Sequence, residues 1–182
     1  MAHSPLTGIP DDIVARAARI RLACFDVDGT LTDGRLYYDD QGRETKAFHV
    51  HDGQGLALLR RFGIDVALIT ARTSAAAERR ATELGLRFHG GIKDKLAQVN
   101  ALCAELGIGL DEVAFVGDDL PDLPPMRAVG LAVAPANAHP WTGEHAHWQT
   151  TADGGQGAAR EICDIILTAQ GHASVLSGAH AQ

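Results

Sequence analysis

The chain has 182 residues, of which 46% are hydrophobic and 21% are charged, a size and composition typical of one globular domain. Its 16 basic and 23 acidic residues leave a net charge of −7, the wrong sign for binding nucleic acid by neutralising phosphates. No apolar run reaches the roughly 18 residues of a membrane-spanning helix, and the first residues lack a signal-peptide pattern. We therefore expect a single cytoplasmic domain over 1–182, with neither nucleic acid nor membrane as a partner.

Segments typical of helices and of strands alternate along the chain. A helical pattern over 10–19 precedes the apolar run Ile20 to Val27, which predicts a buried strand. Three more short apolar runs predict parallel strands that are covered on both faces. These runs are 64–69, 112–116 and 131–134, and helical patterns occupy 55–62, 74–84, 94–106 and 158–169. This alternation predicts an α/β fold with a doubly wound, mostly parallel sheet.

Two segments depart from this alternation. Residues 35–50 hold the turn signal Asp-Asp-Gln-Gly between two strand-like stretches, which predicts a β-hairpin inserted after the first strand. Residues 171–182 are rich in Ser, Gly, Ala and His and are predicted to form a flexible tail. The three cysteines are far apart in apolar stretches, so we expect buried free thiols rather than disulfides or a metal site.

Acidic residues follow the predicted strands at the place where open α/β sheets bind ligands, beyond the carboxyl ends of the strands. The first strand ends at Asp26 and Asp28, and the strand over 112–116 is followed by Asp118 and Asp119. Four carboxylates close together raise one another's pKa unless a cation relieves them. Oxygen ligands that leave coordination positions open favour Mg²⁺. The sequence therefore predicts a magnesium site at this edge of the sheet.

Hydrogen-bond donors converge on the same edge. Thr70 and Arg72 follow the strand over 64–69, and Lys93 and Lys95 lie at the start of the helix over 94–106, where the spacing favours Lys95. With the backbone N–H groups after Asp26, these donors suit a phosphoryl group, whose transfer depends mainly on positioning and charge neutralisation. The reaction class that this predicts is phosphoryl transfer.

The two acids of the first strand fit two different roles. Asp26 and Asp28 are two residues apart, so one can face phosphorus while the other faces the leaving oxygen. An ionised Asp26 can attack in line and form an aspartyl phosphate. Asp28 would protonate the leaving alcohol and then activate the water that cleaves this intermediate. Asp122 is expected to cap or support rather than to bind metal.

In their order along the chain, these motifs resemble the haloacid dehalogenase superfamily of phosphatases. The matching segments are Asp-Val-Asp-Gly-Thr at 26–30, Thr-Ala-Arg at 70–72, Lys95 and Gly-Asp-Asp at 117–119. The segments 42–55, 116–126, 137–140 and 154–161 are similar to the capless octulosonate 8-phosphate phosphatases of that superfamily. The resemblance runs from about residue 13 to 171. It implies a Rossmann-like fold and Mg²⁺-dependent hydrolysis of a sugar phosphate, 3-deoxy-D-manno-octulosonate 8-phosphate, in lipopolysaccharide synthesis.

The resemblance also implies a role for each site residue. It places Mg²⁺ on Asp26, the backbone carbonyl of Asp28, and Asp118, with Asp119 and Asp122 in support. It places Gly29, Thr70, Arg72 and Lys95 around the phosphate and substrate. It further implies a homotetramer in which the hairpins over 35–50 close each active site from a neighbouring subunit, with the C-terminal segment reaching across.

Two positions depart from the pattern of these relatives. Ala71 stands where many have glycine, which is tolerable if the backbone there avoids positive φ. His51 stands where relatives often have arginine, so a charge that contacts substrate would be lost or would depend on pH. Arg72 matches the arginine of the octulosonate phosphatases, whereas nononate 9-phosphate phosphatases often have an acid at that position.

Three alternatives remain open at the level of sequence. A phosphorelay receiver domain has similar residues, but there the phosphoacceptor follows a middle strand, where this chain has Thr70. A non-catalytic oligomerisation module of the same fold would have lost the catalytic acids, which are present here. A phosphatase for another sugar phosphate, such as a nononate 9-phosphate, differs only in its substrate, and an assay distinguishes it.

Overall fold

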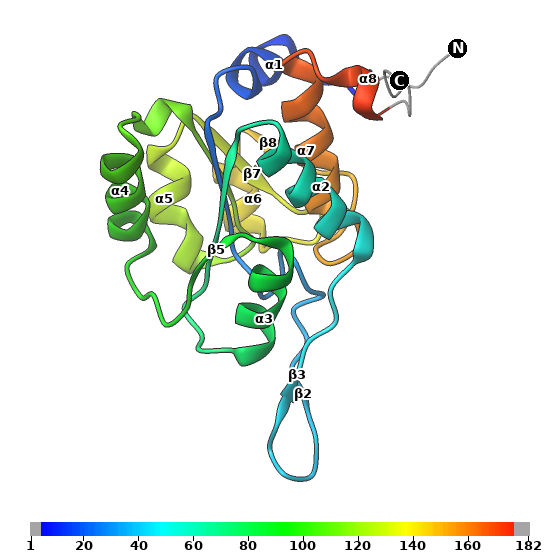
Figure 1. Ribbon diagram of the computed structural model, residues 1–182, viewed down its shortest axis with the longest axis vertical. Helices are drawn as coiled ribbons and strands as arrows, with labels where there is room; N and C mark the ends of the chain where they lie inside the picture. The colour runs from blue at the N-terminus through cyan, green and yellow to red at the C-terminus, as the bar shows by residue number, and fades with distance from the viewer. Residues whose placement is uncertain (1–4, 177–182) are drawn as a thin grey trace.

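A computed structural model describes residues 5–176 and shows one sheet flanked by helices, with a hairpin projecting from it (Figure 1). Six parallel strands form the sheet in the order β5, β4, β1, β6, β7, β8. Their bounds are β1 Leu22–Phe25, β4 Asp65–Ile69, β5 Arg87–His89, β6 Val113–Val116, β7 Leu131–Ala134 and β8 Trp148–Gln149. The predicted doubly wound α/β fold is confirmed.

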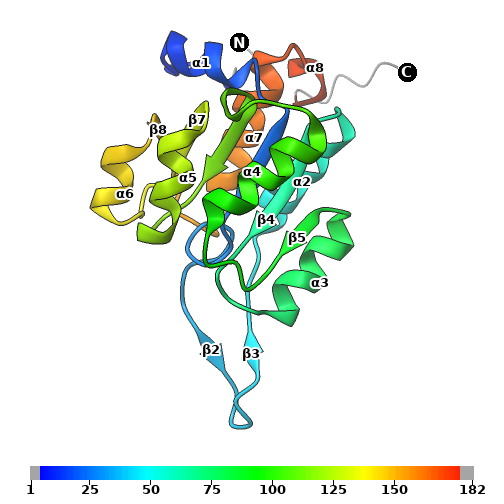
Figure 2. The same cartoon turned by 90° about the vertical axis from the view of Figure 1, so that its left-hand side faces the viewer.

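Helices cover both faces of this sheet (Figure 2). One face packs against α1 (Asp11–Ala17), α2 (Val50–Arg61), α3 (Ala75–Leu84) and α7 (Ala158–Ala169), and the other packs against α4 (Lys95–Leu106) and α5 (Leu123–Ala128). Successive strand residues point to opposite faces. In β1, therefore, Ala23 and Phe25 enter the core beneath α2 and α7, while Leu22 and Cys24 enter the core beneath α4. This is why β1, β6 and β7 are apolar throughout and β4 is apolar after Asp65.

The hairpin predicted over 35–50 is present but shorter. β2 (Tyr37–Tyr38) pairs with β3 (Glu44–Thr45) in an antiparallel ribbon that projects away from the helices (Figures 1 and 2). The Asp39 carboxylate holds the turn by accepting hydrogen bonds from the backbone N–H groups of Gln41 and Arg43. The Phe-His-Val end of the predicted second strand is not a strand, because α2 already begins at Val50.

Helix α2 also begins earlier than the sequence pattern predicts, at Val50 rather than at 55. Glycine is a poor helix former, yet Gly53 and Gly55 both lie inside this helix. A Cβ on Gly55 would lie 3.0 Å from the Cβ of Cys163 in α7, so the glycine permits close packing of the two helices. The buried Asp52 carboxylate accepts the Arg160 N–H of α7 at 2.8 Å. Tertiary contacts with α7 therefore extend α2 beyond its own propensity.

Short elements escaped the sequence analysis because periodicity needs more residues than they contain. These are β5, β8, α5 and α6 (Pro140–His145), with the 3₁₀ turns η1 (Leu110–Glu112) and η2 (Leu120–Asp122). Of the tail predicted over 171–182, residues 173–176 form the short helix α8 (Ala173–Leu176), and 177–182 lie outside the described residues. The three cysteines are buried free thiols, as predicted.

Within residues 5–176, no helix combines the length and the apolar character that crossing a membrane requires.

Candidate active site

The sheet changes its winding direction at β1, which lies between β4 and β6. In such sheets a crevice opens beyond the carboxyl ends of the strands at this point. A pocket of about 310 Å³ occupies it, and every predicted site residue except Gly29 lines it. The lining consists of Asp26, Asp28, Gly34, Thr70, Ala71, Arg72, Lys95, Asp118, Asp119, Pro121 and Asp122. The tertiary structure thus brings together residues that are up to 96 positions apart in the chain (122 minus 26).

Lys95 is the central cation of this pocket. Its Nζ lies 2.7 Å from Asp26 Oδ1 and 2.6 Å from Asp122 Oδ1, and its side chain is only 2% exposed. Lys93, the other candidate, is exposed. The difference arises because Asp94 caps α4 by accepting the N–H of Ala97 at 2.9 Å, which places Lys95 on the first turn of the helix facing the sheet.

Burial and mutual repulsion perturb two carboxyl groups strongly. Burial, followed by repulsion from Asp122, raises the pKa of Asp26 to about 8, although Lys95 opposes the shift. The same two causes raise the pKa of Asp118 to about 7. A carboxyl group whose pKa is raised this far is stabilised in its ionised form when a cation binds beside it.

Asp122 is completely buried and fully engaged by protein groups. Its Oδ1 accepts from Lys95, and its Oδ2 accepts the backbone N–H groups of Asp118 at 3.0 Å and Asp119 at 3.3 Å. Asp119 itself caps η2 through a hydrogen bond from the N–H of Leu120. Asp122 therefore shapes the loop after β6.

The loop after β1 approaches Asp118 closely. Gly29 has a φ of +92°, and a Cβ there would lie 2.1 Å from Asp118 Oδ2. The Thr30 hydroxyl donates a hydrogen bond to Asp118 Oδ1 at 3.0 Å. Only glycine satisfies both the left-handed backbone and the contact, so the Asp-Gly-Thr sequence is what brings the β1 and β6 loops together.

The Gly-Gly-Gln-Gly segment before α7 supports this loop from behind. The N–H of Gly155 donates to the Thr30 carbonyl at 3.1 Å, and a Cβ on Gly154 would lie 1.8 Å from the Gly29 carbonyl oxygen. The turn that opens α7 is therefore in direct contact with the loop after β1.

A Gly154→Ala substitution is expected to lower the free energy of unfolding by about 1–3 kcal/mol, since the new methyl group overlaps backbone atoms that cannot rotate away. Gly143→Ala is the matched control, because a Cβ there has its nearest neighbour at 3.4 Å. Denaturant unfolding of both variants measures the difference. Equal stabilities would contradict the proposed close packing.

Four charged side chains lie together where the hairpin meets the pocket. Asp28 accepts from Lys46 of the hairpin, and Lys46 Nζ lies 3.3 Å from Glu44 Oε1. Arg72 Nη2 lies 2.6 Å from Glu44 Oε1 and 3.1 Å from the Tyr38 hydroxyl. Glu44 and Lys46 were not among the predicted site residues, because the residue pattern over 35–50 indicates only a hairpin.

Thr70 and its neighbours form the floor of the pocket at the end of β4. The buried Thr70 hydroxyl accepts the backbone N–H of Arg72 at 3.2 Å. No non-glycine residue among those described has a positive φ, so Ala71 fits its position without strain. The hydroxyl of Thr70 lines the pocket, where it can donate to a bound oxyanion.

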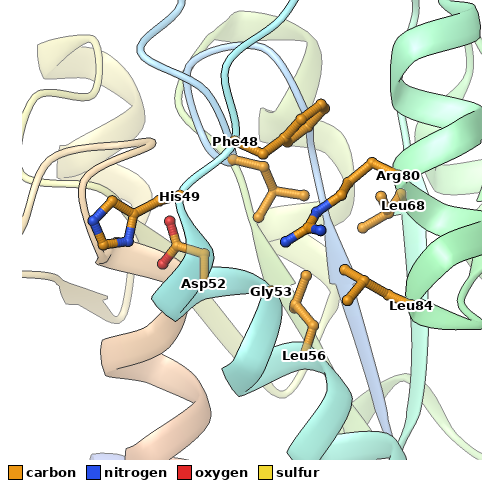
Figure 3. A pocket seen from close by; sticks show the side chains of 9 residues that line it. Phe48, His49, Asp52, Gly53, Leu56, Leu68, Arg80 and Leu84 are labelled. Atoms are coloured by element: carbon orange, nitrogen blue, oxygen red, sulfur yellow. The ribbon is translucent and has the colours of Figure 1, made fainter.

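Other hollows lie away from the acids. Figure 3 shows one between α2 and α3, where the Arg80 guanidinium lies beside Gly53 and Leu84. Its volume is about 10 Å³, which is at most one water molecule. His51 lies on α2, lines a separate hollow with Arg160 and packs edge-on against His49. It does not line the acid pocket of its own chain.

The acidic residues present fit a hard divalent cation. Carboxylate oxygens of Asp26, Asp118 and Asp122 lie within 4.8 Å of one another. Because Asp122 is already engaged by Lys95 and two N–H groups, Asp26 and Asp118 are the carboxylates left to bind. Burial and repulsion from Asp122 raise the pKa of both groups in spite of Lys95, so a further cation would stabilise their ionised forms. Two carboxylates with open positions around them suit Mg²⁺, which retains several waters.

Comparisons with known proteins agree with this geometry. A model of haloacid dehalogenase-like hydrolases matches residues 52–130. The 3-deoxy-D-manno-octulosonate 8-phosphate phosphatase of Yersinia pestis is 48% identical over 163 residues, which cover 89% of this chain and 87% of that protein.

Two solved structures are similar over most of their lengths. A hypothetical protein from Xanthomonas campestris is 59% identical, with a TM-score of 0.97 and full coverage of both chains. The 3-deoxy-D-manno-octulosonate 8-phosphate phosphatase of Moraxella catarrhalis, solved with magnesium, phosphate and its sugar, is 42% identical, with a TM-score of 0.90. The match covers 93% of this chain and 98% of that one.

Proposed function

Because the chain belongs to the 3-deoxy-D-manno-octulosonate 8-phosphate phosphatases of the haloacid dehalogenase superfamily, we propose that it hydrolyses that ester to 3-deoxy-D-manno-octulosonate and phosphate. The observation that carries this proposal is the pocket that Asp26, Asp28, Lys95 and Asp118 line together. In the cell, the product would feed lipopolysaccharide synthesis in the cytoplasm.

The chain's own residues divide the reaction between them. Asp26 attacks phosphorus in line, and its acyl phosphate is later hydrolysed. Lys95, 2.7 Å from Asp26, orients this nucleophile and offsets the negative charge of the phosphoryl group. Thr70 binds a phosphoryl oxygen, and Arg72 binds the sugar acid. Gly29, which was predicted to contact the phosphate, instead donates its N–H to the Thr32 hydroxyl oxygen at 3.3 Å and does not line the pocket. Asp28 protonates the leaving oxygen and then activates water.

Asp26, Asp118 and the backbone carbonyl of Asp28 would hold Mg²⁺, with Asp119 and Asp122 shaping the loop around it. When bound, the ion neutralises charge on the phosphoryl oxygens. The similar Moraxella catarrhalis enzyme, which was solved with magnesium and phosphate, supports this assignment, as does the raised pKa of Asp26 and of Asp118.

We also propose that the protein is a homotetramer whose hairpins assemble centrally and close neighbouring active sites. The projecting hairpin carries exposed apolar side chains that would gain from burial: Leu36 is 48% exposed, Tyr37 42% and Tyr38 57%. Light scattering on the purified protein tests this proposal. A monomeric mass at micromolar concentration would overturn it.

Phosphate release from a panel of sugar phosphates tests the function. Turnover of 3-deoxy-D-manno-octulosonate 8-phosphate is expected to exceed that of other sugar phosphates and to require Mg²⁺. Preference for a nononate 9-phosphate would support the proposed phosphatase mechanism but contradict the proposed substrate. Absence of turnover with every ester would favour a non-catalytic module of the same fold.

Removal of the metal is expected to abolish turnover, and added Mg²⁺ is expected to restore it. Because the pKa values of Asp26 and Asp118 are raised to about 8 and about 7 without metal, uptake of the ion must displace protons as the pH falls below these values. The Mg²⁺ concentration that gives half-maximal activity is therefore expected to rise as the pH is lowered from 8 to 6. A concentration that is independent of pH would contradict these carboxyl assignments.

A further inference from the structure

Thr30 joins three segments that surround the pocket, although it does not line the pocket itself. The residue is completely buried. Its carbonyl accepts the N–H of Gly155, from the turn before α7, at 3.1 Å. Its hydroxyl donates to Asp118 Oδ1, in the loop after β6, at 3.0 Å. Thr30 therefore links the loop after β1 to both of these segments.

The loop that carries Thr30 is held by hydrogen bonds of its own. The Thr32 N–H donates to the Val27 carbonyl at 3.1 Å. The buried Thr32 hydroxyl accepts the N–H groups of Gly29 and Gly34, each at 3.3 Å. Because these bonds fix the backbone on both sides of Thr30, its hydroxyl is held in one place beneath the pocket.

The Asp118 carboxylate depends on Thr30 for its orientation. Among residues 5–176, the Thr30 hydroxyl is the only hydrogen-bond donor to this carboxylate. The other hydrogen bonds of Asp118 hold its backbone, since its N–H donates to Asp122 Oδ2 at 3.0 Å and its carbonyl accepts the N–H of His139 at 2.9 Å. Neighbouring segments thus fix the backbone of Asp118, and Thr30 fixes the direction of its side chain.

A neutral donor suits a carboxylate that is to bind a cation. Lys95 orients Asp26 and Asp122 but brings a positive charge, whereas no basic side chain in the described part of the chain forms an ion pair with Asp118. A hydroxyl group orients the carboxylate without such a charge, so the carboxylate keeps its attraction for a cation. Mg²⁺ requires nearly ideal octahedral geometry, and hydrogen-bonded partners behind the ligands provide that orientation.

We propose that Thr30 is a positioning residue for Mg²⁺, whose hydroxyl orients the Asp118 carboxylate to bind the ion. The inference rests on the proposed function, in which Asp118 is a metal ligand. Thr30 acts through Asp118, since it does not line the pocket. Gly155 contributes by holding the Thr30 carbonyl from the opposite side.

Calorimetric titration of the metal-free protein with Mg²⁺ tests the inference. Thr30→Val keeps the branched shape of the side chain and removes the hydroxyl. Its Kd for Mg²⁺ is expected to rise about 10–100-fold, the usual effect of removing a hydrogen-bonded partner of a metal ligand. The Mg²⁺ concentration that gives half-maximal turnover should rise by the same factor.

Thr30→Ser separates orientation from packing. Because this variant keeps the hydroxyl and loses the methyl group, it should bind Mg²⁺ with nearly wild-type affinity, whereas a packing role would reverse the order of the two variants. If Thr30→Val does not fold, Thr30→Ser and Thr30→Ala, which differ only in the hydroxyl, repeat the comparison. Thr142→Val is the matched control, because Thr142 is also completely buried and its hydroxyl has no hydrogen-bond partner among the residues described.

Two results would overturn the inference while the proposed function stands. One is a wild-type Mg²⁺ affinity of Thr30→Val, and the other is an equal loss of affinity in Thr30→Val and Thr30→Ser. If the wild-type protein binds no Mg²⁺, or if Asp118→Asn binds it as tightly as wild type, the proposed metal site is wrong and the inference fails with it.

Discussion

Asp26→Asn is expected to lower kcat by about 10⁴-fold or more, since an amide oxygen is a far poorer nucleophile than a carboxylate. The fold should persist, because the amide keeps the size of the side chain and its oxygen can still accept from Lys95, now 2.7 Å away. In chelator, the variant should be at least as stable as wild type, since burial and Asp122 raise the pKa of the Asp26 carboxyl to about 8. Replacing the Asp26 carboxyl group with an amide removes its repulsion from Asp122.

Three measurements check this prediction. Steady-state turnover gives the loss, thermal unfolding in chelator gives the stability, and acid-quenched protein from labelled substrate shows whether phosphate is still transferred to the chain. Asp11→Asn, at an exposed position in α1, is the matched control. Appreciable turnover by the Asp26 variant would remove Asp26 as the nucleophile.

Lys95→Ala is expected to reduce both activity and stability. The change leaves the Asp26 and Asp122 carboxylates, both of which Lys95 contacts within 2.7 Å, without their cation. Breaking a buried ion pair by removing one partner typically costs about 3–5 kcal/mol. Loss of the charge near the phosphoryl group should lower kcat by about 10²-fold or more.

Lys93→Ala is the matched control, because Lys93 is exposed and only two positions away. It should retain wild-type turnover and wild-type denaturation midpoint. If Lys93→Ala loses activity while Lys95→Ala keeps it, the assignment of the phosphate-binding lysine is wrong. Added Mg²⁺ should recover part of the stability of Lys95→Ala but not its turnover, since the ion and the lysine occupy different places around Asp26.

Local sequence patterns were sufficient to predict strands β1, β4, β6 and β7 and the acids that follow β1 and β6. The runs that became β1, β4, β6 and β7 are mostly apolar because helices cover both faces of each strand. Since parallel strands end at one edge, residues just after β1 and β6 had to meet there. Asp26 and Asp118 could therefore be predicted as neighbours from their positions alone.

Other parts of the site had no local signal. Lys46 contacts Asp28 across 18 positions, and Lys95 contacts Asp122 across 27. Gly154 packs on Gly29 from the other end of the chain. A lysine on a polar hairpin or a glycine in a turn looks the same in sequence whether or not it supports a pocket. The start of α2 was missed for the same reason, because packing against α7 outweighs the propensity of its glycines.

The sequence by itself determined the α/β fold, which strands are followed by acidic residues, and the class of chemistry. It could do so because hydrophobic periodicity and residue type are local properties. Only the tertiary structure decided that Lys46 of the hairpin engages a carboxylate oxygen of Asp28. It also decided that Lys95 and not Lys93 is buried between two carboxylates. Desolvation and distance set these interactions, and both depend on which distant segments pack together.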